Sequence, residues 1–152
     1  MLTGRQFSDW QPGDQVTTAA RTVTEADVMA FVRLAGLFEP LFLDREFIAS
    51  ETIHKVPIAP GSLTFAFAEG LTIQAGLLHR TGMAFLGIDQ MQLTAPVKIG
   101  DTIRVDIEVV AKEPRGKRPG GVVRFRHVVR NQLDEPVMTY EVLRLIRDLP
   151  AV

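Results

Sequence analysis

The sequence contains no cysteine in its 152 residues. Disulfide bonds, thiolate metal sites and a cysteine nucleophile are therefore excluded. It also lacks an excess of positive charge, because 17 Lys and Arg stand against 18 Asp and Glu, for a formal net charge of −1. A generic nucleic-acid-binding protein neutralises phosphates with surplus cations. Nucleic acid is therefore not an expected partner.

Signals for membranes and export are also missing. No uncharged apolar run reaches the roughly 18 residues that a membrane span needs. The first residues, MLTGRQFSDWQPGD, lack a basic segment followed by an apolar core, so they do not resemble a signal peptide. The length, with 46% hydrophobic and 23% charged residues, is typical of one globular domain. We expect a cytoplasmic protein with no membrane partner.

The first half of the chain predicts short elements. Residues 16–23, VTTAARTV, have the threonine and valine content of a short strand. EADVMAFVRLAG has apolar residues at helical spacing, with Thr24 as its N-cap and Gly36 as its stop. EPLFLDREF is expected to be a loop into a second short helix, which Pro57 and Pro60 end.

A long helix is predicted over residues 61–79, GSLTFAFAEGLTIQAGLLH. Apolar side chains fill most of its circumference, so it should be buried on most sides. The period then changes to two, and TIRVDIEVV and VVRFRHVVR predict half-exposed antiparallel strands, with His127 on the apolar face. This order fits an α+β fold in which a strongly curved antiparallel sheet wraps around one helix.

Four strings in order, EADVMAFVRLAG, EPLFLD, PIAPGSL and LTAPVKIGDTI, resemble the MaoC-like hydratase and dehydratase family, which includes R-specific enoyl-CoA hydratases. The resemblance covers residues 16–142 and depends on all four strings together. It implies a single MaoC-like hotdog domain over residues 1–152, usually dimeric. It also implies binding of an acyl thioester of coenzyme A or acyl carrier protein, and addition of water to the acyl chain or its removal.

The string GLFEPLFLD corresponds to the pattern GDxNPxHxD, whose aspartate and histidine are the catalytic pair in active members of the family. Gly36, Pro40 and Asp44 match this pattern. Leu37 occupies the aspartate position, however, and Phe42 occupies the histidine position. Hydration needs one group to activate water and another to handle the proton at the α carbon, each worth typically ~10²–10⁴-fold in rate. Leucine and phenylalanine can do neither.

The resemblance therefore predicts a MaoC-like acyl-thioester-binding protein that lacks the usual hydratase mechanism. One hypothesis is a non-catalytic partner subunit, which shapes the acyl tunnel while a related catalytic chain supplies the acid and base. The assembly would then be a heterodimer with a catalytic MaoC-like subunit, and a homodimer is the alternative.

The other hypothesis is an active enzyme with displaced residues. Glu39, which replaces the asparagine of the motif, and His54 could serve a hydratase, although Glu39 could simply be exposed and His54 could lie on the surface after a short helix. Asp44 is expected to cap the helix that follows it. Glu69, in the central helix, could act as the base of a hotdog thioesterase or pair with an arginine of the sheet.

Pro60, Gly61 and Ser62 open the central helix and are the predicted substrate-binding residues. Pro60 stands where the family commonly has a histidine, and Gly61 is retained. The resemblance assigns this loop to the thioester oxygen, and amides at a helix start suit an oxygen that gains negative charge. Structurally, Gly61 is expected to start the helix and Ser62 to cap it.

The three histidines, His54, His79 and His127, are too scattered for metal-ligand spacing, so we expect no metal or other cofactor. His79 is expected at the end of the long helix, where a cation suits the helix dipole. EPRGKRPGG is expected to be a hairpin loop, and its cations at positions 115, 117 and 118 could meet the phosphates of coenzyme A or an acidic carrier protein.

Overall fold

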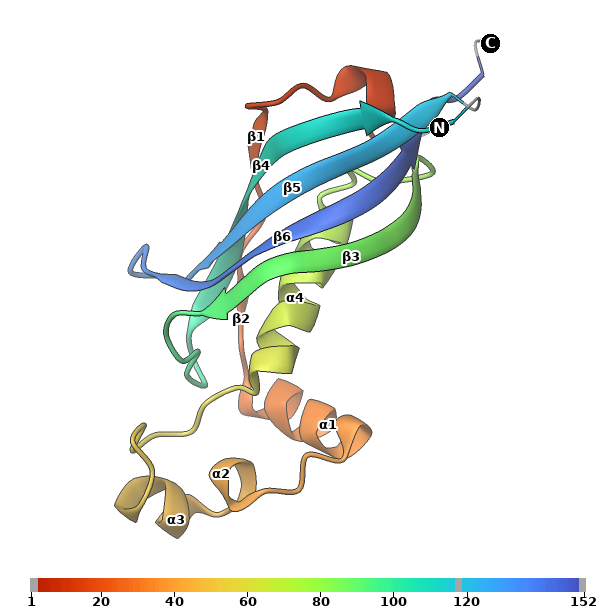
Figure 1. The fold of residues 1–152 in the computed structure, drawn as a ribbon. Coiled ribbons are helices and arrows are strands. Elements are labelled where there is room, and N and C mark those ends of the chain that lie inside the picture. Colours follow the sequence, from red (N-terminus) through yellow and green to blue (C-terminus); the bar gives the residue numbers. More distant parts are fainter. Residues whose placement is uncertain (1–2, 117–118, 151–152) are drawn as a thin grey trace.

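The computed structural model describes residues 3–116 and 119–150. Its elements are η1 (Phe7–Asp9), β1 (Gln15–Thr17), β2 (Arg21–Thr22), α1 (Glu25–Ala35), α2 (Pro40–Leu43), α3 (Arg45–Ser50), α4 (Gly61–Gln74), β3 (Gly82–Leu93), β4 (Thr102–Pro114), β5 (Gly120–Arg130) and β6 (Pro136–Arg147). The strands curve over α4, while α1, α2 and α3 lie beyond one end of the sheet (Figure 1). The predicted α+β class and hotdog fold are confirmed.

The sheet is antiparallel, in the order β1-β4-β5-β6-β3, with β2 also paired to β4. The alternation predicted for β4 and β5 is present, because every second side chain is buried against the helix side. His127 lies on this inner face with 0% of its surface exposed, as predicted. Strand β3, which the sequence patterns did not reveal, pairs only with β6 among the described strands and so forms an edge.

The outer face of the sheet carries a row of cross-strand ion pairs. They are Arg130 with Asp106 at 2.8 Å, Arg126 with Glu108 at 3.6 Å and Glu141 at 3.0 Å, and Arg124 with Glu141 at 3.1 Å and Asp89 at 2.7 Å. Opposite charges on neighbouring strands stabilise such a sheet modestly. These contacts give the arginines of β5 structural partners.

The predicted strand over residues 16–23 is interrupted. The chain leaves the regular ladder at Thr18, where the hydroxyl accepts a hydrogen bond from Val105 N at 3.0 Å, and it rejoins β4 as β2. The predicted helix boundaries at α1 are confirmed. Thr24 accepts from Asp27 N, and Gly36 ends the helix in the left-handed conformation at φ 70°, which glycine adopts without a Cβ penalty.

The central helix is shorter than predicted. α4 ends at Gln74, so His79 lies five residues beyond it in a turn, and the helix-dipole role expected for His79 is wrong. Gly76, with φ 74°, allows the chain to turn back toward β3. None of the helices in the described part of the chain is long and apolar enough to cross a membrane.

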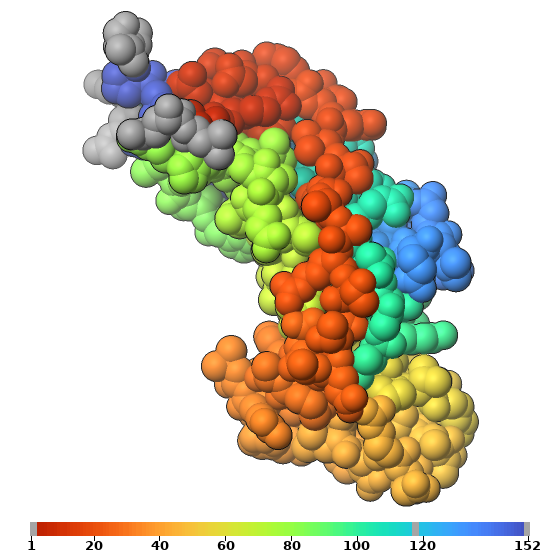
Figure 2. Space-filling view, turned by 180° about the vertical axis from the view of Figure 1, so that it is seen from behind, coloured from red at the N-terminus to blue at the C-terminus, as the bar shows by residue number. Residues whose placement is uncertain are grey.

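In the single chain α4 is buried or half-buried around most of its circumference, as expected, and one side of it is exposed. The buried residues are Leu63, Thr64, Ala68, Leu71 and Thr72. On the opposite side Ala66 is exposed and Ile73 is 56% exposed. Seen from behind, the helix remains uncovered beside the N-terminal segment (Figure 2). This exposed side of the helix is available for contact with another chain.

Candidate functional site

The segment after α1 forms a short helix where a loop was expected. Leu37 N donates to Val32 O at 2.9 Å, which folds the chain back at the end of α1. Pro40 then begins α2, and Glu39 O accepts hydrogen bonds from Phe42 N at 2.9 Å and Leu43 N at 3.2 Å. Proline favours the first helical position because its φ is already fixed there and its missing N–H is not needed.

Leu37 and Phe42 turn toward the protein interior. Both are half-buried and pack against the hydrophobic core. Glu39 is exposed, which was one of the two predictions for it, and its side chain makes no capping hydrogen bond. Asp44 accepts a hydrogen bond from Phe47 N at 3.0 Å and so caps α3, which confirms its predicted structural role.

The first backbone amides of α4 have no capping side chain. Pro60 is buried and stands at the N-cap, and Pro60 O accepts hydrogen bonds from Leu63 N at 3.0 Å and Thr64 N at 3.1 Å. No side chain caps this helix, and Ser62 is exposed within the first turn, so its predicted capping role is wrong. The amides of Gly61 and Ser62 precede the first intrahelical bonds and lie at the positive end of the helix dipole.

A pocket of about 300 Å³ lies beside this helix start. It is lined by His54, Ile58, Ala59, Gly61, Thr64, Leu93, Thr94, Ala95, Pro96, Val97, Val137 and Met138. His54, predicted as a surface residue, is half-buried and lines this pocket. Neither Leu37 nor Phe42 does. A Cβ atom at Gly61 would collide with Leu93 Cδ2, so the leucine packs directly on the glycine backbone.

Glu69 belongs to a buried polar cluster between α4 and the sheet. Its carboxylate forms an ion pair with Arg144 of β6, which confirms the predicted pairing with an arginine of the sheet. The same carboxylate accepts a hydrogen bond from the Tyr140 hydroxyl at 2.8 Å. Tyr140 also lies 2.7 Å from Nδ1 of His127. Burial, followed by the nearby charge of Glu69, raises the pKa of Tyr140 far above its usual range, so the phenol keeps its proton.

The sequence predicted a sheet arginine as a partner of Glu69 but did not identify which one, and it did not predict Tyr140, because Tyr140 and Arg144 are far from Glu69 in the sequence. One signal was present: both residues share the alternation of inward-facing positions along β6. A charged residue in a mostly apolar helix needs a buried partner. Inward-facing polar residues on a neighbouring strand are where such a partner can be sought.

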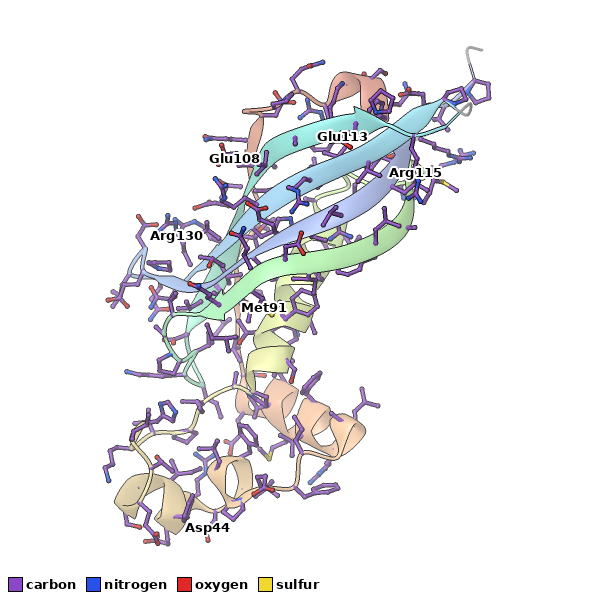
Figure 3. The ribbon with its side chains drawn as sticks, viewed as in Figure 1. Asp44, Met91, Glu108, Glu113, Arg115 and Arg130 are labelled. Carbon is purple, nitrogen blue, oxygen red and sulfur yellow. The ribbon has the colours of Figure 1, made fainter. Side chains whose placement is uncertain are left out.

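The cations of the β4–β5 loop lie away from this region. Figure 3 shows Arg115 and Asp44 at opposite ends of the molecule. Within one chain, the β4–β5 loop therefore does not contact the α2–α3 segment. Lys117 and Arg118 lie outside the described residues. Over residues 3–116 and 119–150, no group of three or more His, Asp or Glu side chains is placed to hold a metal ion.

The sheet wrapped around one helix, with a pocket at the start of that helix, defines a protein of the hotdog class. The model of the MaoC-like domain matches residues 8–131, so the chain belongs to the MaoC-like hydratase and dehydratase family. The family prediction is therefore confirmed.

Individual relatives agree with this assignment. Protein MaoC of Klebsiella aerogenes is 33% identical over 75% of the chain, and the chain spans only 33% of the length of that relative. The (R)-specific enoyl-CoA hydratase of Rhodospirillum rubrum is 28% identical over 73% of the chain and 74% of its own length. The X-ray structure of a monoamine oxidase regulatory protein from Archaeoglobus fulgidus matches with a TM-score of 0.89 and 38% identity over 97% of both chains.

Proposed function

We propose that the chain binds acyl thioesters of coenzyme A or acyl carrier protein within a hotdog dimer, and that it lacks the usual hydratase mechanism. It would serve as a non-catalytic subunit beside a MaoC-like chain that supplies the acid and base. The (R)-specific enoyl-CoA hydratase among its relatives supports the acyl-thioester class of ligand. A cytoplasmic location stays a prediction.

The observation that carries this proposal is the apolar character of the two motif positions. The family motif places aspartate and histidine where this chain has Leu37 and Phe42. Both side chains pack against the core, and neither carries a group that transfers protons. The two nearby carboxylates do not take over the acid and base roles, because Asp44 caps α3 and Glu39 is exposed.

The start of α4 supports the binding role. Gly61 and Ser62 offer amides at the positive end of a 14-residue helix, which suits a thioester carbonyl oxygen. The adjacent pocket of about 300 Å³ has mostly apolar walls and falls at the lower end of the range for small-molecule sites. An acyl chain could therefore be held with its carbonyl at the helix start, without any chemical step.

The edge strand β3 supports the dimer. Six of its large apolar residues are at least 36% exposed in the single chain: Met83, Phe85, Leu86, Ile88, Met91 and Leu93. An apolar edge strand of 12 residues is prone to pair with another chain. In the proposed dimer, the second chain would also cover the exposed side of α4. The proposal includes both a homodimer and a heterodimer with a catalytic subunit.

Turnover assays with the purified chain test the proposal. The chain alone should neither hydrate an enoyl thioester nor dehydrate a 3-hydroxyacyl thioester, yet it should bind these ligands. Activity should appear when a MaoC-like chain with an intact aspartate and histidine is added. Robust hydration by the lone chain, abolished by Glu39→Gln or His54→Ala, would overturn the proposal.

One observation favours the alternative of an active hydratase. His54 lines the same pocket as Gly61 and is the one titratable side chain among the residues that line it. A histidine beside a helix start could move a proton while the amides hold the thioester oxygen. The thioesterase alternative is less well supported, because the Glu69 carboxylate is held by Arg144 and Tyr140. A free-thiol assay with Glu69→Gln distinguishes the two enzymes.

A further inference from the structure

A second, much smaller cavity lies between side chains of the core and the turn that follows α4. Its volume is about 10 Å³, and it is lined by Trp10, Thr72, Leu77, Leu78, Ile107, Phe125, His127 and Arg144. Three of these residues carry a buried polar atom without a hydrogen-bond partner in the described part of the chain: Trp10 Nε1, His127 Nε2 and Arg144 Nε. Buried polar atoms in proteins nearly always have a partner, so the presence of three such residues around one cavity calls for an explanation.

The hydrogen-bond roles of these three atoms can be assigned. The indole Nε1 of Trp10 and the Nε of Arg144 can only donate. The hydroxyl proton of Tyr140 goes to Glu69, so Nδ1 of His127 must carry the proton that joins it to the Tyr140 oxygen at 2.7 Å. Burial, followed by the charge of Arg144, lowers the pKa of His127 to about 3, so the ring is neutral at pH 7. Nε2 of His127 is then an acceptor.

We propose that this cavity binds a single water molecule, which accepts hydrogen bonds from Trp10 Nε1 and Arg144 Nε and donates one to His127 Nε2. Buried waters typically make about three hydrogen bonds, and a cavity of this size is about what one water needs. The hydroxyl of Thr72, which donates to Ala68 O at 2.9 Å, also lines the cavity and keeps lone pairs for the second water proton.

A halide ion is the competing occupant, because two N–H donors alone would suit an anion. The lone pair on Nε2 of His127 opposes it. The surrounding side chains of Leu77, Leu78 and Ile107 are apolar, so an anion would lose its hydration without full replacement. Water can both accept and donate, and it therefore matches all three groups.

The proposed water would join distant parts of the fold. Trp10 follows η1 in the N-terminal segment, and its ring packs edge-on against Phe125 with centroids 5.0 Å apart. His127 and Arg144 belong to the cluster that binds Glu69 of α4. One water would thus connect the N-terminal segment, the sheet and the central helix through hydrogen bonds. This inference does not depend on the proposed function.

NMR of the intact ¹⁵N-labelled protein tests the proposal, because the chain has a single tryptophan and so a single indole N–H resonance. That proton should show cross peaks at the water frequency with opposite signs in NOESY and ROESY spectra, which excludes simple exchange. Long-range ¹H–¹⁵N spectra should show His127 protonated at Nδ1 only. Trp10→Phe should shift the Nε2 resonance of His127, because the water loses one donor.

Thr81→Val is the matched control. Thr81 Oγ1 is also buried without a partner in the described chain, but Thr81 does not line the cavity, so the indole–water cross peaks should persist in this variant. Absence of these cross peaks in the unsubstituted protein, or protonation of His127 at Nε2, overturns the proposal. A shift of the indole resonance when bromide replaces chloride, without a water cross peak, identifies a halide and also overturns it.

Discussion

Glu69 of α4 and Arg144 of β6 form an ion pair between the helix and the sheet, with side chains only 17% and 7% exposed. Tyr140 adds a hydrogen bond to the same carboxylate. Removing one partner of a buried pair leaves the other charge without compensation, which costs far more than the pair itself contributes. This geometry gives Glu69 a structural task, namely to fix α4 against β6.

Glu69→Gln should therefore lower the free energy of unfolding by about 3–5 kcal/mol, because Arg144 would remain buried without its counter-charge. Urea denaturation measures the loss. Glu25→Gln is the control, since the pair of Glu25 with Arg45 is exposed, and it should cost less than about 1 kcal/mol. A Glu69→Gln protein of unchanged stability that has lost a thiol-releasing activity would instead favour the thioesterase alternative.

Leu86→Glu should weaken the proposed dimer. Leu86 is 43% exposed on the edge strand β3, and a carboxylate there would be desolvated when a second chain covers this edge. Sedimentation velocity at several concentrations should show a shift toward the monomer. Leu133→Glu, in the exposed turn between β5 and β6, offers a control with 69% exposure that should leave the dimer intact. Equal effects from both substitutions would contradict an interface at β3.

The parts of the fold that follow from local pattern were predicted well. The alternation in β4 and β5 identified their buried faces, including His127, and the cap and stop of α1 followed from Thr24 and Gly36. Strand β3 was missed because its large apolar residues do not alternate, and all six of them are exposed in the single chain. The proposed dimer would cover these side chains, and the surface that covers them cannot be read from the local pattern of one chain.

In the candidate site, too, local features were predicted and contacts between distant residues were not. Asp44 as a cap is a local feature and was predicted. The pocket that joins His54 to Gly61 depends on residues 93–97 and β6, and the pair of Glu69 with Arg144 spans 75 residues, so neither follows from local spacing. Tertiary packing decides which distant polar groups meet, and the sequence indicates only that a buried charge needs a partner.

Gly61→Ala should weaken acyl-thioester binding with little loss of stability. The new methyl group would collide only with the end of the Leu93 side chain, which is 58% exposed and can rotate. The displaced leucine would then narrow the pocket that it lines with Gly61. Calorimetric titration with an acyl-CoA should show weaker binding, while urea denaturation should change by less than about 1 kcal/mol.

Adding Leu93→Ala to the Gly61→Ala protein should restore binding, because it removes the displaced side chain. Leu93→Ala alone provides the matched reference. Failure of the double variant to recover would mean that the pocket beside α4 is not where the acyl group binds.

Restoring the family pair should create activity if the rest of the acyl site is intact. Leu37→Asp with Phe42→His should hydrate an enoyl thioester, while each single variant should stay near the background, because acid and base each contribute typically ~10²–10⁴-fold. Leu37→Asn with Phe42→Gln is the control of similar polarity without proton transfer. Both double variants should lose stability, since these positions pack against the core. A folded but inactive restored pair would show that other parts of the site have also diverged.

The buried state of His127 should make stability depend on pH in a defined window. Burial and then the charge of Arg144 lower its pKa from the ordinary value of 6.5 to about 3. Between these values the unfolded chain binds the proton and the folded chain does not, so protonation favours unfolding. The contribution is therefore fully present above pH 6.5 and is lost as the pH falls toward 3, at up to about 1.4 kcal/mol per pH unit.

Urea denaturation between pH 7 and pH 4 measures this slope. His127→Gln removes the titrating group, so its unfolding free energy should fall less steeply with acid than that of the unsubstituted protein. His79→Gln, at an exposed position, should keep the original slope. If His127→Gln keeps it as well, the buried histidine takes up no proton on unfolding in this range. The neutral ring on which the acceptor role of Nε2 depends would then lose its support.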